Sequence, residues 1–270
     1  ATYPRIIHSE MMTHRVFSRN ASSSRAIPVG RLIQDVIDDP VYPSHWGKNQ
    51  PGMSADQEHD EMVSDFDSQF GPASREYTWD RARESAIYFA QMFAAAGYHK
   101  QIVNRLLEPF VHINVVVTAT QWRNFLALRD HPGAQPEIRV LAQEIRLAMA
   151  KSVPTVLTPG TWHLPYVTSQ DRVILSEQEM IKVSVARCAR VSYMTHDGKE
   201  PRIKEDIDLY ERLMGSVPLH ASPAEHQATP DSLFPPRHTK SGEWSSPNLH
   251  GNLRGWVQYR KTLSGENQDD

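Results

Sequence analysis

The sequence predicts a helix-rich fold in which helix clearly exceeds strand. Two observations support this prediction. Apolar side chains recur at helical spacing in several separate segments, whereas only Val111–Val117 is an apolar run of mostly β-branched residues. A chain of 270 residues with 39% hydrophobic and 23% charged residues is ordinary for a globular protein and can bury a substantial core. The segments with helical spacing are residues 80–97, 99–107, 121–129, 137–150, 181–195 and 205–214.

The first of these elements follow one another closely. Alanine and phenylalanine recur along residues 80–97 until Gly97, a residue type that commonly ends helices. A second short helix is expected over residues 99–107, ended by Pro109. Val111–Val117 is then either a buried strand or an extended segment that enters the next helix.

Two further helices and a connection come next. Residues 121–129 form a predicted helix for which Thr118 or Thr120 is a suitable N-cap. Residues 137–150 carry an apolar face, and residues 152–180 form a proline-rich connection.

The remaining segments are less periodic. Residues 40–78 are rich in turn formers but contain aromatic anchors, so we expect a long ordered excursion. The tail from Pro230 is rich in turns until Leu253–Arg260. No internal repeat divides the chain, and we expect residues 1–270 to form a single domain.

The most informative stretch runs from Thr13 to Arg25. Arginines, a histidine, an asparagine and serines crowd this stretch, and a core could not satisfy so many donors. Forked guanidinium groups and short hydroxyls are typical of loops that hold phosphate or carboxylate groups. The alternative is a solvated basic loop.

The spacing within this stretch resembles a family signature. The pattern His-Arg-x-x-Ser-x-Asn-x-x-Ser-x-Arg, which starts at His14 and ends at Arg25, resembles the Arg-His-Arg-x-x-Ser-x-Asn-x-x-Ser-x-Arg signature of flavin-dependent thymidylate synthases. Thr13 stands in place of the first arginine, and Ala21 is a further substitution in the loop.

A second block, within residues 100–150, is similar to two other motifs of that family. Asn124 and Arg129 match the ends of its Asn-Phe-x-x-x-Arg motif, while Thr118 and Thr120 replace an asparagine and an arginine of the family. Arg105, in Asn-Arg-Leu-Leu-Glu-Pro, resembles an arginine that reaches the nucleotide.

A third block, residues 181–230, resembles the opening of the family domain, which has an Ala-Arg-Val-Ser-Tyr helix and a His-x-Ser-Pro-x-Glu-His turn. Here Ala189–Tyr193 and His220–His226 carry these pieces. The pieces precede the signature in the family but follow it in this chain. A circular permutation would explain the order, and it predicts that residues 181–230 pack beside residues 1–30.

The resemblance implies an α+β fold with a central, mostly antiparallel sheet, and methylation of deoxyuridylate (dUMP) to thymidylate (dTMP). It implies FAD as cofactor, methylenetetrahydrofolate and NADPH as co-substrates, and a homotetramer with shared active sites. The implied flavin-binding residues are His14, Arg15, Asn20, Asn124, His220 and Ser222, and the implied nucleotide-binding residues are Ser23, Arg25, Arg105 and Arg129. Arg129 and Ser23 would be catalytic, with Arg129 favouring the ionised pyrimidine.

Composition limits the alternatives. The net charge of -3 argues against a general nucleic-acid binder. The single cysteine, Cys188, excludes an internal disulfide, suits a reducing cytoplasm, and lacks the Pro-Cys-His setting of conventional thymidylate synthases. No apolar run approaches the roughly 20 residues that span a bilayer. No metal-binding histidine motif is present, so a metal-dependent hydrolase is the weakest alternative.

Two rival functions stay open. A pyrimidine hydroxymethylase would transfer the same carbon and quench it with water, and the four substitutions Thr13, Ala21, Thr118 and Thr120 make this a real alternative. A non-catalytic nucleotide- or RNA-binding module would use the arginine- and serine-rich loop without any flavin.

Overall fold

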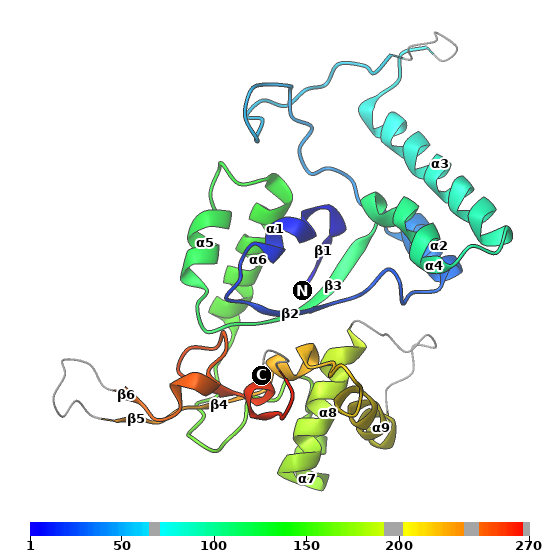
Figure 1. The fold of residues 1–270 in the computed structure, drawn as a ribbon. Coiled ribbons are helices and arrows are strands. Elements are labelled where there is room, and N and C mark those ends of the chain that lie inside the picture. Colours follow the sequence, from blue (N-terminus) through cyan, green and yellow to red (C-terminus); the bar gives the residue numbers. More distant parts are fainter. Residues whose placement is uncertain (65–70, 192–201, 235–242, 267–270) are drawn as a thin grey trace.

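The computed structural model describes the chain except residues 65–70, 192–201, 235–242 and 267–270. Figure 1 shows a helix-rich α+β fold with small antiparallel sheets, as expected. The α-helices are α1 (His8–Met12), α2 (Val29–Asp38), α3 (Arg75–Ala95), α4 (Lys100–Val103), α5 (Arg123–Arg129), α6 (Pro136–Lys151), α7 (Ser169–Ile174), α8 (Glu177–Arg190) and α9 (Ile203–Met214). The strands are β1 (Thr2–Pro4), β2 (Ser18–Ala21), β3 (His112–Thr118), β4 (Ala228–Pro230), β5 (Leu233–Phe234), β6 (Glu243–Trp244) and β7 (Trp256–Gln258). The 3-10 turns are η1 (Arg5–Ile7), η2 (Asn104–Phe110), η3 (Ser222–Glu225), η4 (Pro247–Leu249) and η5 (Tyr259–Thr262).

A three-stranded antiparallel sheet, of order β1-β3-β2, lies at the centre of the molecule. Its middle strand β3 is the β-branched segment expected from the sequence. Tyr3 pairs with Ile113 on one side, and Asn20 pairs with Val116 on the other. The sheet therefore places the middle of the signature, in β2, directly against β3.

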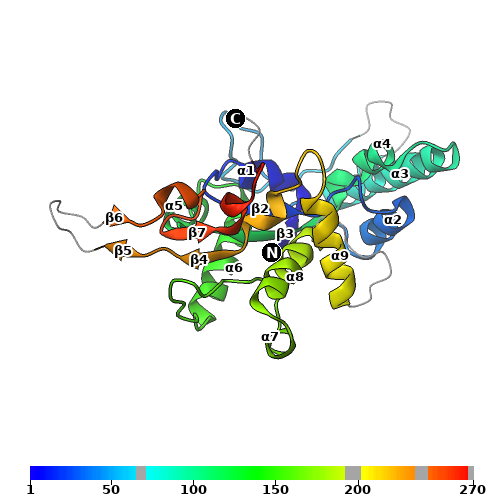
Figure 2. The ribbon, with the colours of Figure 1, turned by 60° about the horizontal axis from the view of Figure 1, so that its bottom comes forward.

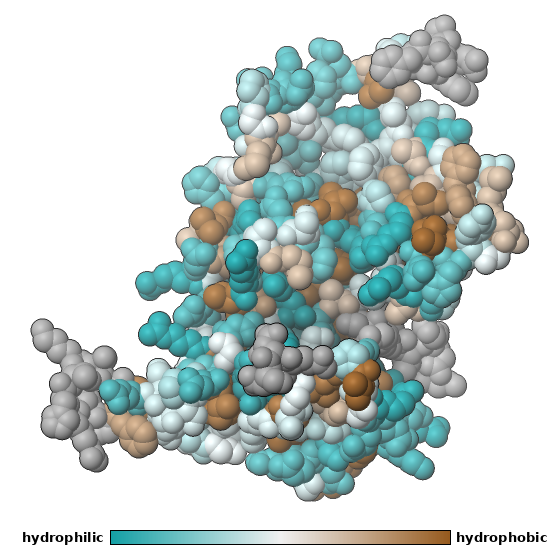
Figure 3. Space-filling model, in the orientation of Figure 1, coloured by the Kyte–Doolittle hydropathy of each residue, from teal (hydrophilic) through white to brown (hydrophobic). Residues whose placement is uncertain are grey.

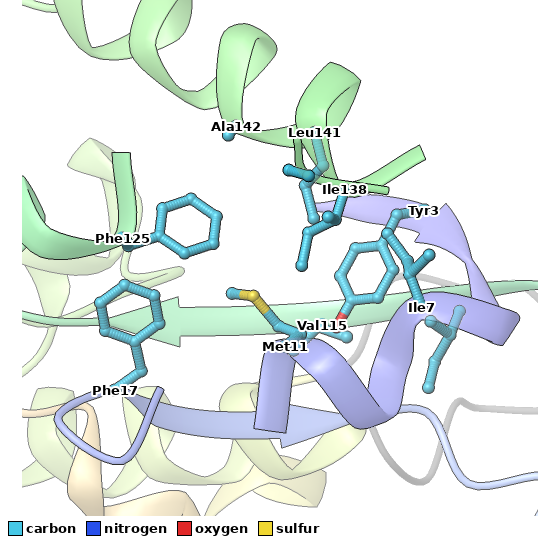
Figure 4. Close-up of a cluster of buried hydrophobic side chains, with 11 residues drawn as sticks. Tyr3, Ile7, Met11, Phe17, Val115, Phe125, Ile138, Leu141 and Ala142 are labelled. Atoms are coloured by element: carbon cyan, nitrogen blue, oxygen red, sulfur yellow. The ribbon is translucent and has the colours of Figure 1, made fainter. Parts of the chain in front are cut away.

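The largest described core cluster joins this sheet to α1, α5 and α6 (Figure 4). Met11 of α1, Phe125 of α5 and Ile138 of α6 are almost completely buried in it. Burial of each such side chain adds about 1.5–3 kcal/mol to the free energy of unfolding, compared with leaving the side chain exposed. This packing fixes the position of α5, which carries Arg129, relative to the signature.

Two further clusters of buried hydrophobic side chains pack other helices together. One packs α2 against α3 and η2, and the other packs α8 and α9 against η3. In Figures 1 and 2, α3 and the paired strands β5 and β6 lie at opposite ends of the molecule. Figure 3 shows apolar surface at the α3 end, where Tyr88, Phe89 and Met92 are about half exposed.

Several element boundaries differ from the sequence prediction. Helix α5 begins only at Arg123 with Trp122 as its N-cap residue, and neither Thr118 nor Thr120 caps it, because β3 extends through Thr118. The turn η2 continues past Pro109 to Phe110.

The connection over residues 152–180 contains helix α7, which the sequence analysis missed. Thr168 and Asp171 form a capping box at its start, a signal that is present in the sequence. Another capping box starts α8 at Ser176, earlier than expected. Residues 192–195 of the expected helix lie outside the described residues.

No helix of the described residues combines the length and apolarity needed to cross a membrane.

Candidate functional site

The structure joins His14 of the signature to Arg129 of the second block. Arg129 is the last residue of α5, and its Nε donates to His14 Nε2 at 3.0 Å. His14 is buried against Phe17 and Phe125, whose rings contact its imidazole. Two residues separated by 115 positions, one assigned by resemblance to the flavin and one to the pyrimidine, are therefore direct neighbours.

Glu10 and Thr13 also form hydrogen bonds with Arg129. Arg129 Nη1 donates to Glu10 Oε2 at 2.9 Å, and Nη2 donates to the Thr13 hydroxyl at 3.3 Å. Sequence reasoning missed Glu10, which lies in α1, before the start of the signature. Thr13 thus contacts Arg129 from the position where the family signature has an arginine.

These contacts define the charge state of His14. Because Arg129 donates to Nε2, this nitrogen acts as an acceptor and the proton of the neutral ring lies on Nδ1. Burial lowers the pKa of His14, and the positive charges of Arg129 and Arg19 lower it further. The imidazole is therefore neutral at physiological pH, while the guanidinium beside it carries the positive charge.

The signature also contacts the third block directly. Asn20 of β2 is buried, and its Nδ2 donates to the carbonyl oxygen of Cys188 in α8 at 3.2 Å. Turn η3 packs against both β2 and α8. Residues 181–230 therefore pack beside residues 1–30 where both are described, as the motif order predicted. A circular permutation as the origin of this order stays a prediction.

A cavity of about 330 Å3 lies where these blocks meet. Asn20, His220 and Ser222 all line it, so the structure brings together predicted residues from the two ends of the chain. Arg260 also lines it, from a tail segment to which sequence reasoning assigned no role. The complete lining is Asn20, Leu213, Leu219, His220, Ala221, Ser222, Pro223 and Arg260.

The second and third blocks meet through Thr118 and His226. The Thr118 hydroxyl and His226 Nδ1 share a hydrogen bond of 2.9 Å. His226 is fully buried, and burial lowers its pKa to about 3, with the neighbouring His163 contributing. Its Nε2 has no hydrogen-bond partner among the described residues. A buried imidazole of this kind is neutral at any physiological pH.

Glu108 lies at the centre of a separate group that includes Arg105, one of the expected nucleotide-binding residues. Arg105 Nη1 donates to Glu108 Oε1 at 2.7 Å, and the Ser24 hydroxyl donates to the same oxygen at 2.6 Å. Glu108 therefore ties Arg105 to the loop that carries Ser23 and Arg25. The Arg25 side chain is exposed, and Ser23 is half-buried.

Arg15 and Asn124 are exposed, and neither lines the cavity beside η3. Apart from these two, the expected site residues fall into three sets on one subunit: the His14–Arg129 pair, the cavity set and the Glu108 set. The sequence could not show that Glu108 connects Arg105 to the loop, because no sequence motif marks a carboxylate that pairs with arginines.

Cys188 is buried on the inner side of α8, and burial raises the pKa of its thiol to about 12. Its side chain is therefore protonated and shielded, which disfavours a nucleophilic role. Within the described parts of the chain, no group of three or more histidine, cysteine or acidic side chains could hold a metal ion.

Comparison with known proteins identifies the family. A family model described as "Thymidylate synthase complementing protein" matches residues 1–155, which include the signature, the second block and the excursion over residues 40–78. Neither the curated proteins nor the solved structures gave a match to the chain. Because the matched range covers more than half of the chain and contains His14, Asn20 and Arg129, the protein belongs to the thymidylate synthase complementing protein family, the flavin-dependent thymidylate synthases.

Proposed function

We propose that the protein methylates dUMP to dTMP, with methylenetetrahydrofolate as the carbon donor and NADPH as the source of electrons. The direct contact between Arg129 and His14 carries the proposal, since it joins the residue expected at the pyrimidine to one expected at the flavin. Family membership supports the general activity.

The side chains around the cavity fit a flavin. An amide from Asn20, a hydroxyl from Ser222 and an imidazole from His220 can hydrogen-bond to the polar edge of a ring system. A cavity of about 330 Å3 is at the small end for ligand pockets, so it would take only part of FAD. The exposed Arg15 is suited to the charged remainder.

FAD, when bound and reduced, supplies the hydride that completes the methyl group. Arg129 provides positive charge where negative charge develops on the pyrimidine, and its contacts to Glu10 and Thr13 hold the guanidinium in place beforehand. Ser23 and Arg25, with Arg105, are suited to hold the nucleotide, its phosphate above all. The neutral imidazole of His14 can form a hydrogen bond with the flavin without adding charge to the site.

We also propose that the active enzyme is a homotetramer with shared active sites. Arg25, Arg105 and Asn124 stand exposed on a single subunit, and the exposed aromatic face of α3 offers apolar area for association. A second copy would cover residues that otherwise face solvent.

The rival reaction is hydroxymethylation of a pyrimidine nucleotide. The structure gives two of the four substitutions specific contacts: Thr13 with Arg129, and Thr118 with His226. The substituting side chains Thr13 and Thr118 themselves supply only hydroxyl groups and no basic group that would activate water. We therefore favour methylation.

The first test is retention of the cofactor. Protein mixed with FAD and passed through a desalting column should keep flavin absorbance in proportion to protein. A colourless protein without measurable FAD affinity would refute the proposed function and favour a non-catalytic nucleotide-binding module.

A further inference from the structure

The C-terminal segment from Trp256 to Glu266 contacts both the signature and turn η3. Strand β7 pairs with β4, which directly follows η3 and His226. Gln258 is almost completely buried, and its Nε2 donates to the Ser18 hydroxyl at 3.1 Å and to the Glu225 carbonyl oxygen at 2.9 Å. One amide thus connects the signature to the turn that lines the cavity. This segment lies beyond the range matched by the family model.

Arg260 continues this connection into the cavity itself. Its Nη1 donates to Glu225 Oε1, and its Nε donates to Glu266 Oε2 at 2.8 Å. The side chains of Glu225 and Glu266 are only 18% and 13% exposed, so both carboxylates depend on a cationic partner. Lys261 pairs with Glu266 as well, whereas Arg260 is the partner seen for Glu225 among the described residues.

We propose that Arg260, which lines the cavity with Asn20, His220 and Ser222, is a positioning residue of the flavin site. It pairs with the carboxylate of Glu225, at the end of the turn that carries Ser222, and neutralises that charge beside the cavity. The inference rests on the proposed function, because it assigns that cavity to FAD. It adds the tail of the chain to a site that the motifs alone place in residues 14–226.

The physical reason is electrostatic. FAD is an anion, and a carboxylate that is only 18% exposed and has lost its ion-pair partner would oppose its binding through a medium that screens poorly. Removal of Arg260 takes away the direct ion-pair partner of Glu225 and leaves only the more distant charge of Arg19 to offset it, so FAD binding should weaken. Neutralising Glu225 in the same chain should remove most of that penalty, because the repulsive charge is then absent.

The experiment measures the dissociation constant of FAD for four proteins by flavin fluorescence. Arg260→Met should weaken binding by about tenfold or more, as expected for loss of a charge-assisted contact. The double variant Arg260→Met with Glu225→Gln should return to within about threefold of wild type. Lys261→Met, which removes the neighbouring cation from Glu266 but does not line the cavity, is the matched control and should bind like wild type.

Three outcomes would overturn the inference. Wild-type affinity in Arg260→Met shows that Arg260 does not act on the site, while the proposed function stands. A double variant as weak as Arg260→Met shows that Arg260 does not act through Glu225. Absence of FAD binding in the wild-type protein refutes the proposed function and the inference together.

Folding is controlled separately. Without FAD, Arg260→Met should melt below Lys261→Met, because Glu225 loses its ion-pair partner whereas Glu266 keeps Arg260 in Lys261→Met. FAD binding is therefore compared at a temperature at which all of the variants remain folded. If Arg260→Met is too unstable to assay, Glu225→Gln alone carries the test. It should bind FAD at least as tightly as wild type, and a tenfold loss would contradict the inference.

Discussion

Arg129 shows how much a single residue contributes to the candidate site. Its three nitrogens donate to His14, Glu10 and Thr13, and its side chain is 21% exposed. Because the Glu10 side chain is 35% exposed, its ion pair with Arg129 should add only about 0–1 kcal/mol to stability. We therefore propose that Arg129 serves nucleotide binding more than stability.

The matched pair Arg129→Lys and Arg25→Ala tests this division. Both variants should melt close to wild type without ligand, because a lysine in place of Arg129 keeps the positive charge and because Arg25 is exposed. Each should lose about 1.5–3 kcal/mol of dUMP affinity, since a charge-assisted contact is removed or loses its forked geometry. Thermal shift with and without dUMP measures both quantities. Full dUMP-induced stabilisation in both variants would show that the nucleotide lies elsewhere.

His226 should make stability depend on pH. Its pKa in the folded state, about 3, lies below the ordinary value of 6.5, so the unfolded chain binds a proton that the folded chain does not. This contribution to stability is complete above pH 6.5 and is lost as the pH falls from 6.5 toward 3. The loss is about 1.4 kcal/mol per pH unit.

His226→Asn checks this contribution, because an amide can replace Nδ1 in the bond to Thr118 but does not titrate. Denaturant unfolding at several pH values should give the variant a shallower decline below pH 6.5 than wild type. Parallel curves for the two proteins would show that His226 is not the titrating group. His14 and His163 shift in the same direction and remain in both proteins, so the decline will not vanish.

Cys188 should be dispensable for chemistry. Its thiol is buried with a raised pKa, and it is the backbone carbonyl of this residue that contacts Asn20. Cys188→Ala should keep most turnover and lose about 1 kcal/mol of stability from the small cavity it leaves. Abolished turnover in a folded, FAD-loaded variant would point to covalent catalysis by the thiol.

At the scale of elements, helix α6 anchors the core that positions α5. Ile138 is fully buried in this core, while Val140 on the same helix is 52% exposed. Ile138→Ala should cost about 2–5 kcal/mol of unfolding free energy. Val140→Ala, the matched control, should change it by no more than about 0.5 kcal/mol. Chemical denaturation measures both, and equal effects would mean that α6 does not pack as described.

The sequence predicted the helices whose apolar faces are regular, and it failed where tertiary contacts decide. Helix α6 was expected over residues 137–150 and spans Pro136–Lys151. Thr118 was a reasonable cap on local grounds, but its backbone pairs in β3 and its hydroxyl pairs with His226. The prolines before helix α7 indicate an irregular connection, whereas the capping box of Thr168 and Asp171 indicates the start of a helix, and the structure follows the capping box.

For the whole molecule, the candidate site depends on segments that are far apart in the chain. The motifs predicted that the signature and the third block would meet, and Asn20 does contact Cys188. The sequence did not predict Glu10, Glu108 or Arg260 as site residues. Each contacts the site through partners that only the fold brings near. Residue type and spacing identify groups that bind ligands, whereas the residues that hold them appear only in three dimensions.

The most direct test of the account is the mass of the product. The protein, loaded with FAD and reduced with NADPH without oxygen, is given dUMP and methylenetetrahydrofolate, and the nucleotide is analysed by mass spectrometry. We expect dTMP, in an amount that follows the FAD bound, and none from Arg129→Ala. A hydroxymethylated nucleotide would show that the protein is a hydroxymethylase and not a methylase. Unchanged dUMP with a fully FAD-loaded protein would contradict the account.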